Sequence, residues 1–298
     1  MSAVVIDGKK IADQIKLEII EEVKQLKEKY GKVPGLAVIL VGQDPASQVY
    51  VKMKGKSCEE CGFYSVTENL DADVDEQILY NKIDELNKEP QINGILIQLP
   101  LPKKFNELKI IQLVDPSKDV DGIHPVSIGK LVLGLSTFRS CTPYGIQELL
   151  KRYNINPSGK HVVVVGRSNI VGKPIANILL QKAEWANAIV TLTHTGAKDI
   201  SYYTKQADIL IAAVGVPKII KENMVKNEVV IIDVGVNRVE DKTAKNGYKL
   251  VGDVNYDAVF DKASFITPVP KGVGPMTIAM LMKNTLQSFK ETIQRNIL

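Results

Sequence analysis

The chain has 298 residues, enough for two domains, and its hydrophobic content of 45% is normal for a globular protein. The net charge of +4, from 38 basic and 34 acidic residues, is too small and too dispersed to suggest nucleic-acid binding. The start, MSAVVIDGKKIADQIK, has no apolar core followed by a small-residue cleavage site, and no run of about 18 apolar residues occurs. We therefore expect a cytoplasmic protein that binds neither nucleic acid nor a membrane.

Three cysteines, Cys58, Cys61 and Cys141, cannot form a closed set of disulfides, which suits a reducing compartment. Cys58 and Cys61 form a C-x-x-C at the end of a helical pattern, just before Gly62, where the helix dipole has the wrong sign to lower a thiol pKa. A zinc site needs four ligands, and no second pair is present. We interpret them as helix-end cysteines and expect no metal.

Apolar runs and helical patterns alternate along the first half of the chain. Asp7 can cap a helix that runs to about Tyr30, and Thr142 with Pro143 predicts the N-cap and first residue of a helix to about Tyr153. The remaining predictions are strands over 36–41, 64–69 and 92–99 and helices over 48–61, 75–86 and 108–114. Pro100 ends the third strand at the edge of the sheet where ligands of α/β proteins bind.

The second half repeats the alternation after a polar, proline-containing segment, 154–159, that is a plausible domain boundary. The predicted strands are 162–165, 189–193, 209–214, 229–234 and 265–269, and the predicted helices are 175–182 and 276–294. Continuous apolar strands of this kind are covered on both faces, as in parallel sheets. The fold class is therefore α/β, with two parallel α/β domains and a cleft between them.

Gly166 and Gly172 punctuate the turn between the strand 162–165 and the helix that follows. Such a turn points backbone N–H groups and a helix dipole at one spot, where a pyrophosphate can bind. The spacing, G-x-x-x-x-x-G, is neither the dinucleotide fingerprint nor a P-loop. The pattern alone leaves nucleotide binding and a packing role for the glycines equally open.

Tyr50 and Lys54 stand at i and i+4 on one helical face. Such a pair is usually a solvated surface, and the neighbouring Lys52 and Lys56 fit that interpretation. A lysine in an apolar pocket instead has its pKa lowered towards neutrality, which suits it to proton transfer. Both interpretations stay open on these residues alone.

Three further groups fall on strand ends or loops. Gln98 can cap a neighbouring strand end or hold a lysine or ligand. Asp119 and Asp121, in KDVDG, can cap their own backbone, or an ionised carboxylate can accept two parallel hydrogen bonds from an amino-heterocycle. In PKGVGP, 270–275, two glycines allow a ligand to approach the backbone.

Taken together, the order and local sequence of six motifs resemble one family over nearly the whole chain. The motifs are YVKMK at 50–54, GILIQLPLP at 94–102, KDVDG at 118–122, CTP at 141–143, VVGRSNIVGKP at 164–174 and ITPVPKGVGPMT at 266–277. They are similar to the bifunctional methylenetetrahydrofolate dehydrogenase/cyclohydrolase family, called FolD in bacteria. The resemblance implies NADP-dependent oxidation of 5,10-methylenetetrahydrofolate to 5,10-methenyltetrahydrofolate, followed by hydrolysis to 10-formyltetrahydrofolate.

The resemblance also implies residue roles. Lys54 is then the catalytic lysine, most needed in the addition of water, and Gln98 tunes its protonation. Tyr50 stacks on the folate, and Asp121 binds the amino edge of the pterin. The implied substrate-binding residues are Tyr50, Val51, Lys52, Met53, Lys54, Ile97, Gln98, Leu99, Asp121, Pro270, Gly272, Val273, Gly274 and Pro275. The implied cofactor-binding residues are Gly166, Arg167, Ser168, Ile170, Val171, Gly172, Thr195 and Val236.

The family further implies a homodimer and a discontinuous first domain. The expected folate-binding catalytic domain is 1–145 plus 277–298, because the last helix returns to it, and 146–276 is the expected Rossmann-like NADP-binding domain. Two alternatives are a monofunctional dehydrogenase and a non-catalytic nucleotide-binding module, since a fold does not fix a function. The full set Tyr50, Lys54, Gln98 and Asp121 disfavours both.

The residues themselves favour NADP over NAD. An NAD-specific unit is expected to carry an acid at the end of its second strand, and this chain has Thr193, His194, Thr195 and Gly196 there. Arg167 in the turn is available for a 2′-phosphate. Lys271 departs from the family pattern, because many members have glycine at that place.

Overall fold

The computed structural model describes residues 2–243 and 247–297. The chain forms two compact units, and each is assembled from separate stretches of sequence. We call Asp13–Cys141 with Ile278–Leu298 the Lys54 unit, and Met1–Ala12 with Thr142–Thr277 the Gly166 unit.

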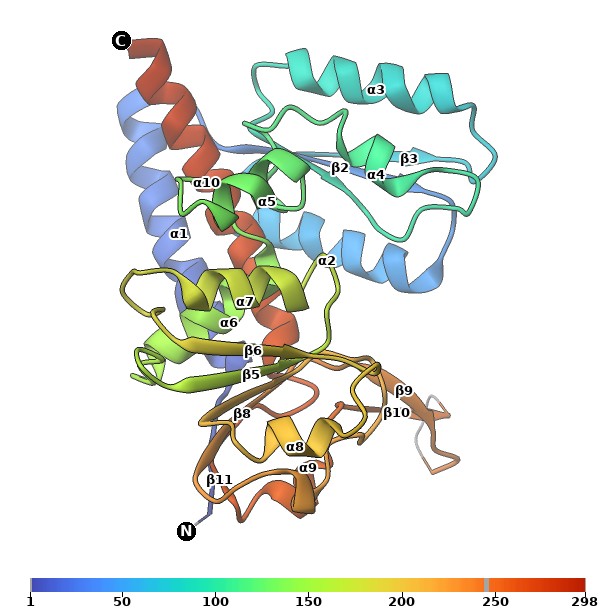
Figure 1. The fold of residues 1–298 in the computed structure, drawn as a ribbon. Coiled ribbons are helices and arrows are strands. Elements are labelled where there is room, and N and C mark those ends of the chain that lie inside the picture. The colour runs from blue at the N-terminus through green and yellow to red at the C-terminus, as the bar shows by residue number, and fades with distance from the viewer. Residues whose placement is uncertain (1, 244–246, 298) are drawn as a thin grey trace. The chain divides into compact units, whose positions relative to one another are not determined.

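A three-stranded parallel sheet organises the Lys54 unit. Its strand order is β3-β2-β4, with β2 (Gly35–Val41) between β3 (Tyr64–Leu70) and β4 (Gly94–Ile97). Helices α2 (Pro45–Glu60) and α3 (Glu76–Lys88) lie on opposite sides of it (Figure 1). One face of β2 packs against α3 in a buried apolar cluster, because alternate strand residues point to the same side.

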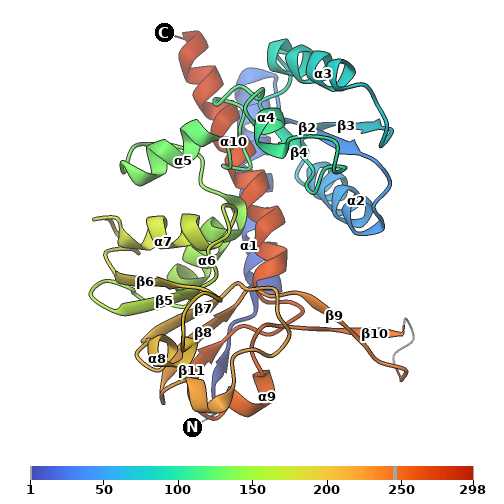
Figure 2. The same cartoon turned by 45° about the vertical axis from the view of Figure 1, so that its right-hand side comes forward.

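Two long helices contribute to this unit. Helix α10 (Val273–Ile297) and helix α1 (Gly8–Tyr30) lie side by side here, and Lys290 donates a 2.6 Å hydrogen bond to Glu22 (Figures 1 and 2). On another side of α10, Ser288 Oγ donates to the backbone oxygens of Asn93 and Ser117. The short helices α4 (Glu107–Ile111) and α5 (Pro125–Val132) lie in the segment that follows β4.

A six-stranded parallel sheet organises the Gly166 unit, with the order β1-β11-β8-β7-β5-β6 (Figure 2). The strands are β1 (Val4–Val5), β5 (His161–Val165), β6 (Ile189–Thr193), β7 (Ile209–Ala212), β8 (Val229–Asp233) and β11 (Ala263–Ile266). The central strands β5, β7 and β8 are buried and β-branched, as parallel strands covered on both faces require. Because the strands are parallel, their carboxyl ends share one edge.

The connections of the Gly166 unit are helical apart from one hairpin. The helices are α6 (Cys141–Arg152), α7 (Gly172–Leu180), α8 (Ile200–Thr204), η1 (Glu222–Met224) and α9 (Tyr256–Val259). The antiparallel pair β9 (Asn237–Glu240) and β10 (Tyr248–Val251) stands apart from the main sheet (Figure 2).

The α/β class with two parallel sheets is confirmed, and several boundaries are corrected. Helix α6 begins at Cys141, so the prediction of Thr142 as its N-cap is wrong. The predicted strand over 92–99 is confined to β4, and the one over 265–269 is β11, which begins and ends earlier. The elements β1, α5, α8, α9 and the β9–β10 hairpin were not predicted. None of the described helices combines the length and apolar character that a membrane crossing needs.

Candidate active site

Lys54 and Gln98 meet in the interior of the Lys54 unit. Asp44 caps α2 by accepting from the backbone N–H of Ser47, and almost three turns after the cap Lys54 is only 8% exposed. Lys54 Nζ donates a 2.8 Å hydrogen bond to Gln98 Oε1, just beyond the end of β4. Gln98 Nε2 donates to the Leu99 carbonyl at 2.7 Å, which orients the amide so that its oxygen faces the lysine. The first interpretation of Lys54, a solvated helix surface, is therefore wrong.

Burial and neighbouring charge set the protonation of this lysine. Burial lowers the pKa of Lys54, and the nearby Asp121 and Cys141 oppose that shift by favouring the charged form. Burial likewise raises the pKa of Asp121, while Lys54 acts in the opposite direction. The pKa of Cys141 is raised well above its usual range by burial and then by Asp121, so this thiol stays protonated. The protonation of Lys54 and that of Asp121 therefore depend on each other, because each charge favours the other while burial disfavours both.

The two aspartates of KDVDG serve different purposes. Asp119 accepts from the backbone N–H of Ile123 at 3.3 Å and of His124 at 2.9 Å, so it holds its own turn. Burial raises the pKa of Asp119 to about 6. The side chain of Asp121 interacts with Lys54 and Cys141 instead.

The backbone on both sides of Asp121 is fixed by side chains far away in the sequence. Ser140 Oγ donates to the carbonyl of Gly122 at 2.7 Å. Asn284 Nδ2, from α10, donates to the carbonyl of Val120 at 2.8 Å. These contacts fix the backbone that holds Asp121 near Lys54. The sequence around Asp121 does not predict them.

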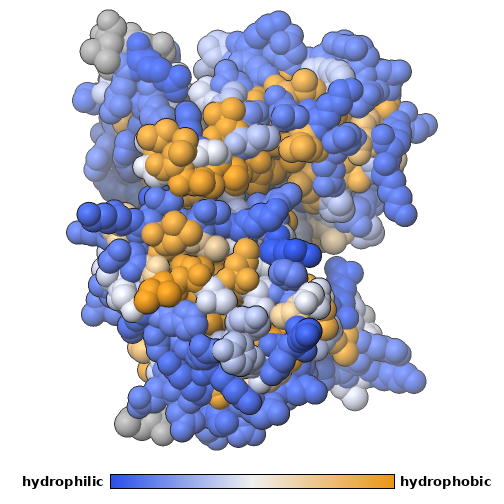
Figure 3. All heavy atoms as spheres, in the orientation of Figure 1, coloured by the Kyte–Doolittle hydropathy of each residue, from blue (hydrophilic) through white to orange (hydrophobic). Residues whose placement is uncertain are grey.

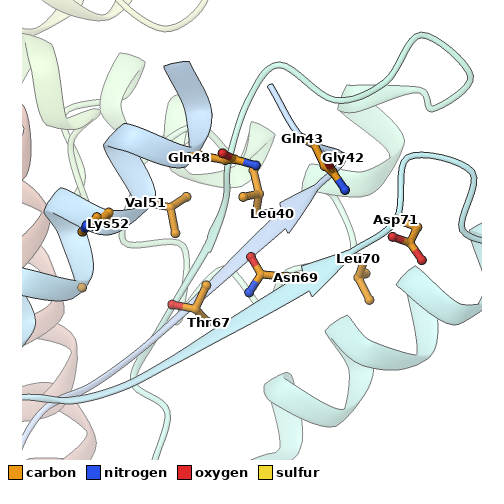
Figure 4. A pocket seen from close by; sticks show the side chains of 11 residues that line it. Leu40, Gly42, Gln43, Gln48, Val51, Lys52, Thr67, Asn69, Leu70 and Asp71 are labelled. Atoms are coloured by element: carbon orange, nitrogen blue, oxygen red, sulfur yellow. The ribbon is translucent and has the colours of Figure 1, made fainter. Parts of the chain in front are cut away.

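The other predicted substrate-binding residues of this unit are distributed on two sides of α2. Tyr50, 45% exposed, and the exposed Met53 lie within the turn that precedes Lys54. Val51 and Lys52 line a different hollow of about 550 Å³, together with β2 and β3 side chains such as Thr67 (Figure 4). The predicted Ile97 is buried at the end of β4, and Leu99 is partly buried one residue after Gln98. The structure thus groups Lys54, Gln98 and Asp121 and separates Lys52 from them.

The segment 270–275 belongs to the Gly166 unit, at the end of β11 and the start of α10. Pro270 and Gly274 are exposed, Gly272 and Val273 are buried, and Pro275 is partly buried. A Cβ on Gly272 would lie 2.4 Å from the Pro268 carbonyl oxygen, so this position requires glycine.

The turn after β5 is closed by backbone contacts that explain its glycines. A Cβ on Gly172 would lie 2.0 Å from the carbonyl oxygen of Gly166, and Gly166 itself has a φ of 118°. Ser168 Oγ accepts from the backbone N–H of Val171 at 3.1 Å and of Gly172 at 3.3 Å. Arg167, Ser168 and the following Ile170 are exposed. The turn therefore presents a cation and a helix start to solvent.

Two more predicted cofactor residues lie after parallel strands of the same sheet. Thr195 is exposed two residues after β6, where His194 Nδ1 accepts from the backbone N–H of Gly196. Val236 is exposed after β8. With Gly166 they fall at the carboxyl edge of the sheet, where α/β proteins bind ligands.

The cysteines of the C-x-x-C lie at the end of α2, as predicted. Burial raises the pKa of Cys58 to about 12 and that of Cys61 to about 11. Both thiols are therefore poor nucleophiles, which confirms that they are helix-end cysteines.

Comparison with known proteins places these two units in one family. A model of the tetrahydrofolate dehydrogenase/cyclohydrolase catalytic domain matches residues 6–121, and a model of the NAD(P)-binding domain of the same proteins matches residues 140–293. The chain belongs to the tetrahydrofolate dehydrogenase/cyclohydrolase family. The resemblance drawn from its six motifs is thereby confirmed.

Relatives in this family match over almost their full length. The bifunctional protein FolD of Chlorobium phaeobacteroides is 57% identical over 288 residues, which are 96% of this chain and 98% of that protein. The crystal structure of FolD from Campylobacter jejuni is 47% identical, with a TM-score of 0.92, and covers 97% of this chain and 99% of its own. FolD of Trypanosoma brucei, complexed with NADP cofactor and inhibitor, is 37% identical with a TM-score of 0.93, covering 99% of each chain.

The residues that support the candidate site were not predicted from the sequence. Cys141 was recognised in CTP but not as a neighbour of Lys54, and the contacts of Ser140 and Asn284 were not foreseen. Asp233 and Asp253, both buried in the Gly166 unit, were also missed. Their local signal is an aspartate near a glycine at a strand end, with Gly235 two residues after Asp233 and Gly252 directly before Asp253, and this combination is also common in ordinary turns.

Proposed function

We propose that the protein is a bifunctional one-carbon enzyme that uses NADP to oxidise 5,10-methylenetetrahydrofolate to 5,10-methenyltetrahydrofolate and then hydrolyses this product to 10-formyltetrahydrofolate. The observation that carries the proposal is the buried Lys54 bonded to Gln98 and facing the charge of Asp121. Family membership and the NADP complex of the Trypanosoma brucei relative support the same activity.

The first step moves a hydride from the methylene bridge and leaves a cationic methenyl bridge. NADP supplies the hydride acceptor when bound. The residues that fit it are the exposed Arg167 and Ser168 with the closed turn at Gly166, since a cation and backbone N–H groups suit phosphate. The proposed cofactor-binding set is completed by Ile170, Val171, Gly172, Thr195 and Val236.

The second step adds water to the bridge carbon. Neutral Lys54 takes a proton from the water as the carbon–oxygen bond forms, and a proton reaches N5 as the carbon–N5 bond breaks. Its lowered pKa increases the neutral fraction available for this transfer. Gln98 Oε1 accepts from both the charged and the neutral amine, so it holds Lys54 in place throughout.

The folate is proposed to be held by its pterin edge and its ring face. The Asp121 carboxylate suits paired N–H donors of an amino-heterocycle, and the half-exposed Tyr50 ring suits stacking. We assign this function to the domain 1–145 plus 277–298 and cofactor binding to 146–276. The separate family matches at 6–121 and 140–293 support a division of the chain between residues 121 and 140, and the grouping of 278–298 with 13–141 supports the assignment of the last helix to the first domain.

We also propose that the protein is a cytoplasmic homodimer. The three free, buried cysteines fit a reducing compartment. β6 is an outer strand of its sheet, at the edge opposite β1, and hydrophobic side chains gather over α7 and β6 (Figure 3). The exposed members are Leu180, Ile189 and Leu192. An outer strand has unpaired backbone hydrogen-bonding groups, and together with exposed apolar side chains these suit pairing with a second copy of the chain.

The proposed activity is tested by following NADPH formation and methenyl decay with purified protein. Lys54→Met should lower hydrolysis by about a hundredfold or more, because the proton-transfer group is gone. Lys56→Met is the matched control, since Lys56 lies on the same helix with its side chain 75% exposed. A wild type that turns over no folate contradicts the proposed function, whereas hydrolysis unaffected by Lys54→Met contradicts the proposed role of the lysine.

A further inference from the structure

A buried carboxylate occupies the loop that follows β7 in the Gly166 unit. Asp253 is fully buried, and its side chain accepts from three consecutive backbone N–H groups. The distances are 2.6 Å from Val214, 2.9 Å from Gly215 and 3.0 Å from Val216. Gly215 has a φ of 73°, and such a turn of converging N–H groups is an anion-binding nest. Here the chain supplies the anion itself.

A second buried aspartate fixes the position of the first. Asp233, at the end of β8, accepts from the backbone N–H of Asp253 and of Val254 at 2.9 Å each, and from Gly235 at 3.0 Å. A Cβ on Gly252 would lie 1.7 Å from Asp233 Oδ2, so the two segments pack as closely as backbone allows.

These contacts involve two loops. The loop after β7 supports Gly166, and the loop after β8 carries Val236. Ala213 precedes the nest, and a Cβ on Gly166 would lie 2.1 Å from its carbonyl oxygen, so the turn after β5 rests directly on this loop. Val236 lies between two anchored neighbours. Gly235 donates to Asp233, and Asn237 Nδ2 donates to Asp253 Oδ1 at 2.9 Å. A shift of the Asp253 carboxylate would therefore displace both loops.

We propose that Asp253, held by Asp233, is a positioning residue that sets the loops after β7 and β8 for NADP binding. This inference rests on the proposed NADP-dependent function. The carboxylate occupies the nest before NADP binds, so the backbone of these loops is already ordered. The free-energy cost of ordering it during NADP binding is therefore smaller. Without it, three N–H donors lose their partner and the loop that supports Gly166 relaxes.

The test is calorimetric titration of NADP into the full-length protein. Asp253→Asn replaces one acceptor oxygen by a donor that faces the nest, and it should raise the Kd for NADP about tenfold. Asp257→Asn is the matched control, because Asp257 is an exposed residue four positions further on, and its Kd should equal that of wild type. In turnover, the KM for NADP should rise in Asp253→Asn while the KM for the folate does not.

A purely structural role would lower the melting temperature without changing the Kd of the folded protein. An unchanged Kd in folded Asp253→Asn therefore overturns the inference. If that variant does not fold, Asn237→Ala is the second test of the inference, because it removes only one hydrogen-bond donor to Asp253. It should raise the Kd for NADP several-fold, and an unchanged Kd again overturns the inference. A wild type that binds no NADP overturns the proposed function and this inference with it, whereas equal tight binding by wild type and variants overturns the inference alone.

Discussion

Lys271 has a φ of 83°, in the left-handed region where a side chain crowds the backbone. The residue is exposed, and its carbonyl accepts from the backbone N–H of Lys9 at 2.9 Å, so the conformation is held by the surrounding chain. Glycine, which the family resemblance led us to expect at this position, adopts such a φ without strain.

Lys271→Gly should therefore raise the free energy of unfolding by about 1 kcal/mol, because the relief of strain exceeds the added entropy of the unfolded chain. Denaturant unfolding of both proteins measures the difference. Lys198→Gly, at another exposed lysine without a left-handed φ, should give no gain. Equal effects at the two positions would show that strain at Lys271 is not the cause.

Arg167 is the exposed cation of the turn after β5. If it holds the 2′-phosphate, Arg167→Ala should raise the KM for NADP about tenfold or more and leave the KM for NAD nearly unchanged, since NAD lacks that phosphate. Steady-state kinetics with both cofactors measures this. Lys173→Ala, a nearby exposed cation bonded to Asn169, serves as the control. Equal effects of Arg167→Ala on both cofactors refute the proposed contact.

Asp233 should make stability depend on pH. Burial raises the pKa of its carboxyl from 3.8 to about 7 in the folded protein, with Asp253 adding to the shift and backbone N–H donors opposing it. The folded state thus binds a proton that the unfolded state has released. The stabilisation is fully present below pH 3.8 and is lost as the pH rises to about 7.

Asp233→Asn removes this titration but adds a cost that does not vary with pH. The unfolding free energy of wild type relative to the variant should therefore fall by about 2 to 4 kcal/mol between pH 4 and pH 7. Denaturant unfolding at several pH values measures it. A constant difference across that range would mean that Asp233 is not protonated in the folded protein near neutrality.

At the scale of single elements, β6 carries the prediction on assembly. Ile189 is 65% exposed on this outer strand, so Ile189→Asp should place a charge in the proposed interface and convert the dimer to monomer. Sedimentation velocity reports the mass. Leu133→Asp, at a residue 73% exposed after α5 in the Lys54 unit, should leave assembly unchanged. A monomeric wild type, or a dimer that persists in Ile189→Asp, contradicts the proposal.

Elements with a strong periodic or continuous apolar signal were predictable. The strand over 189–193 matches β6 in full, and β5 differs from its prediction by one residue, because buried β-branched runs have few alternatives. The four- and five-residue helices α9 and α8 are too short to show a helical period. α5 did have a signal, since His124 caps it and Pro125 follows, but the surrounding carboxylates read as a turn.

For the whole molecule, the family resemblance located the candidate site better than any local pattern. The resemblance predicted that Gln98 lies beside Lys54, although the two are far apart in sequence, because the motifs around them are long. The structure confirms the contact. The supports from Ser140, Asn284 and Asp253 were not foreseen. They depend on which distant segments pack together, and single-residue chemistry does not encode that.

The shared residues of the two units have a consequence for synthesis on the ribosome. Val4 pairs with Phe265 in the sheet of the Gly166 unit, and Asn93 accepts from Ser288 in the Lys54 unit. Each unit therefore pairs early residues with residues that are synthesised much later. The sheet of the Gly166 unit lacks β11, and the Lys54 unit lacks α10, until these late segments have been synthesised. The surfaces of β1 and α1 that they cover therefore stay exposed for most of synthesis, although the three-stranded sheet of the Lys54 unit can form much earlier.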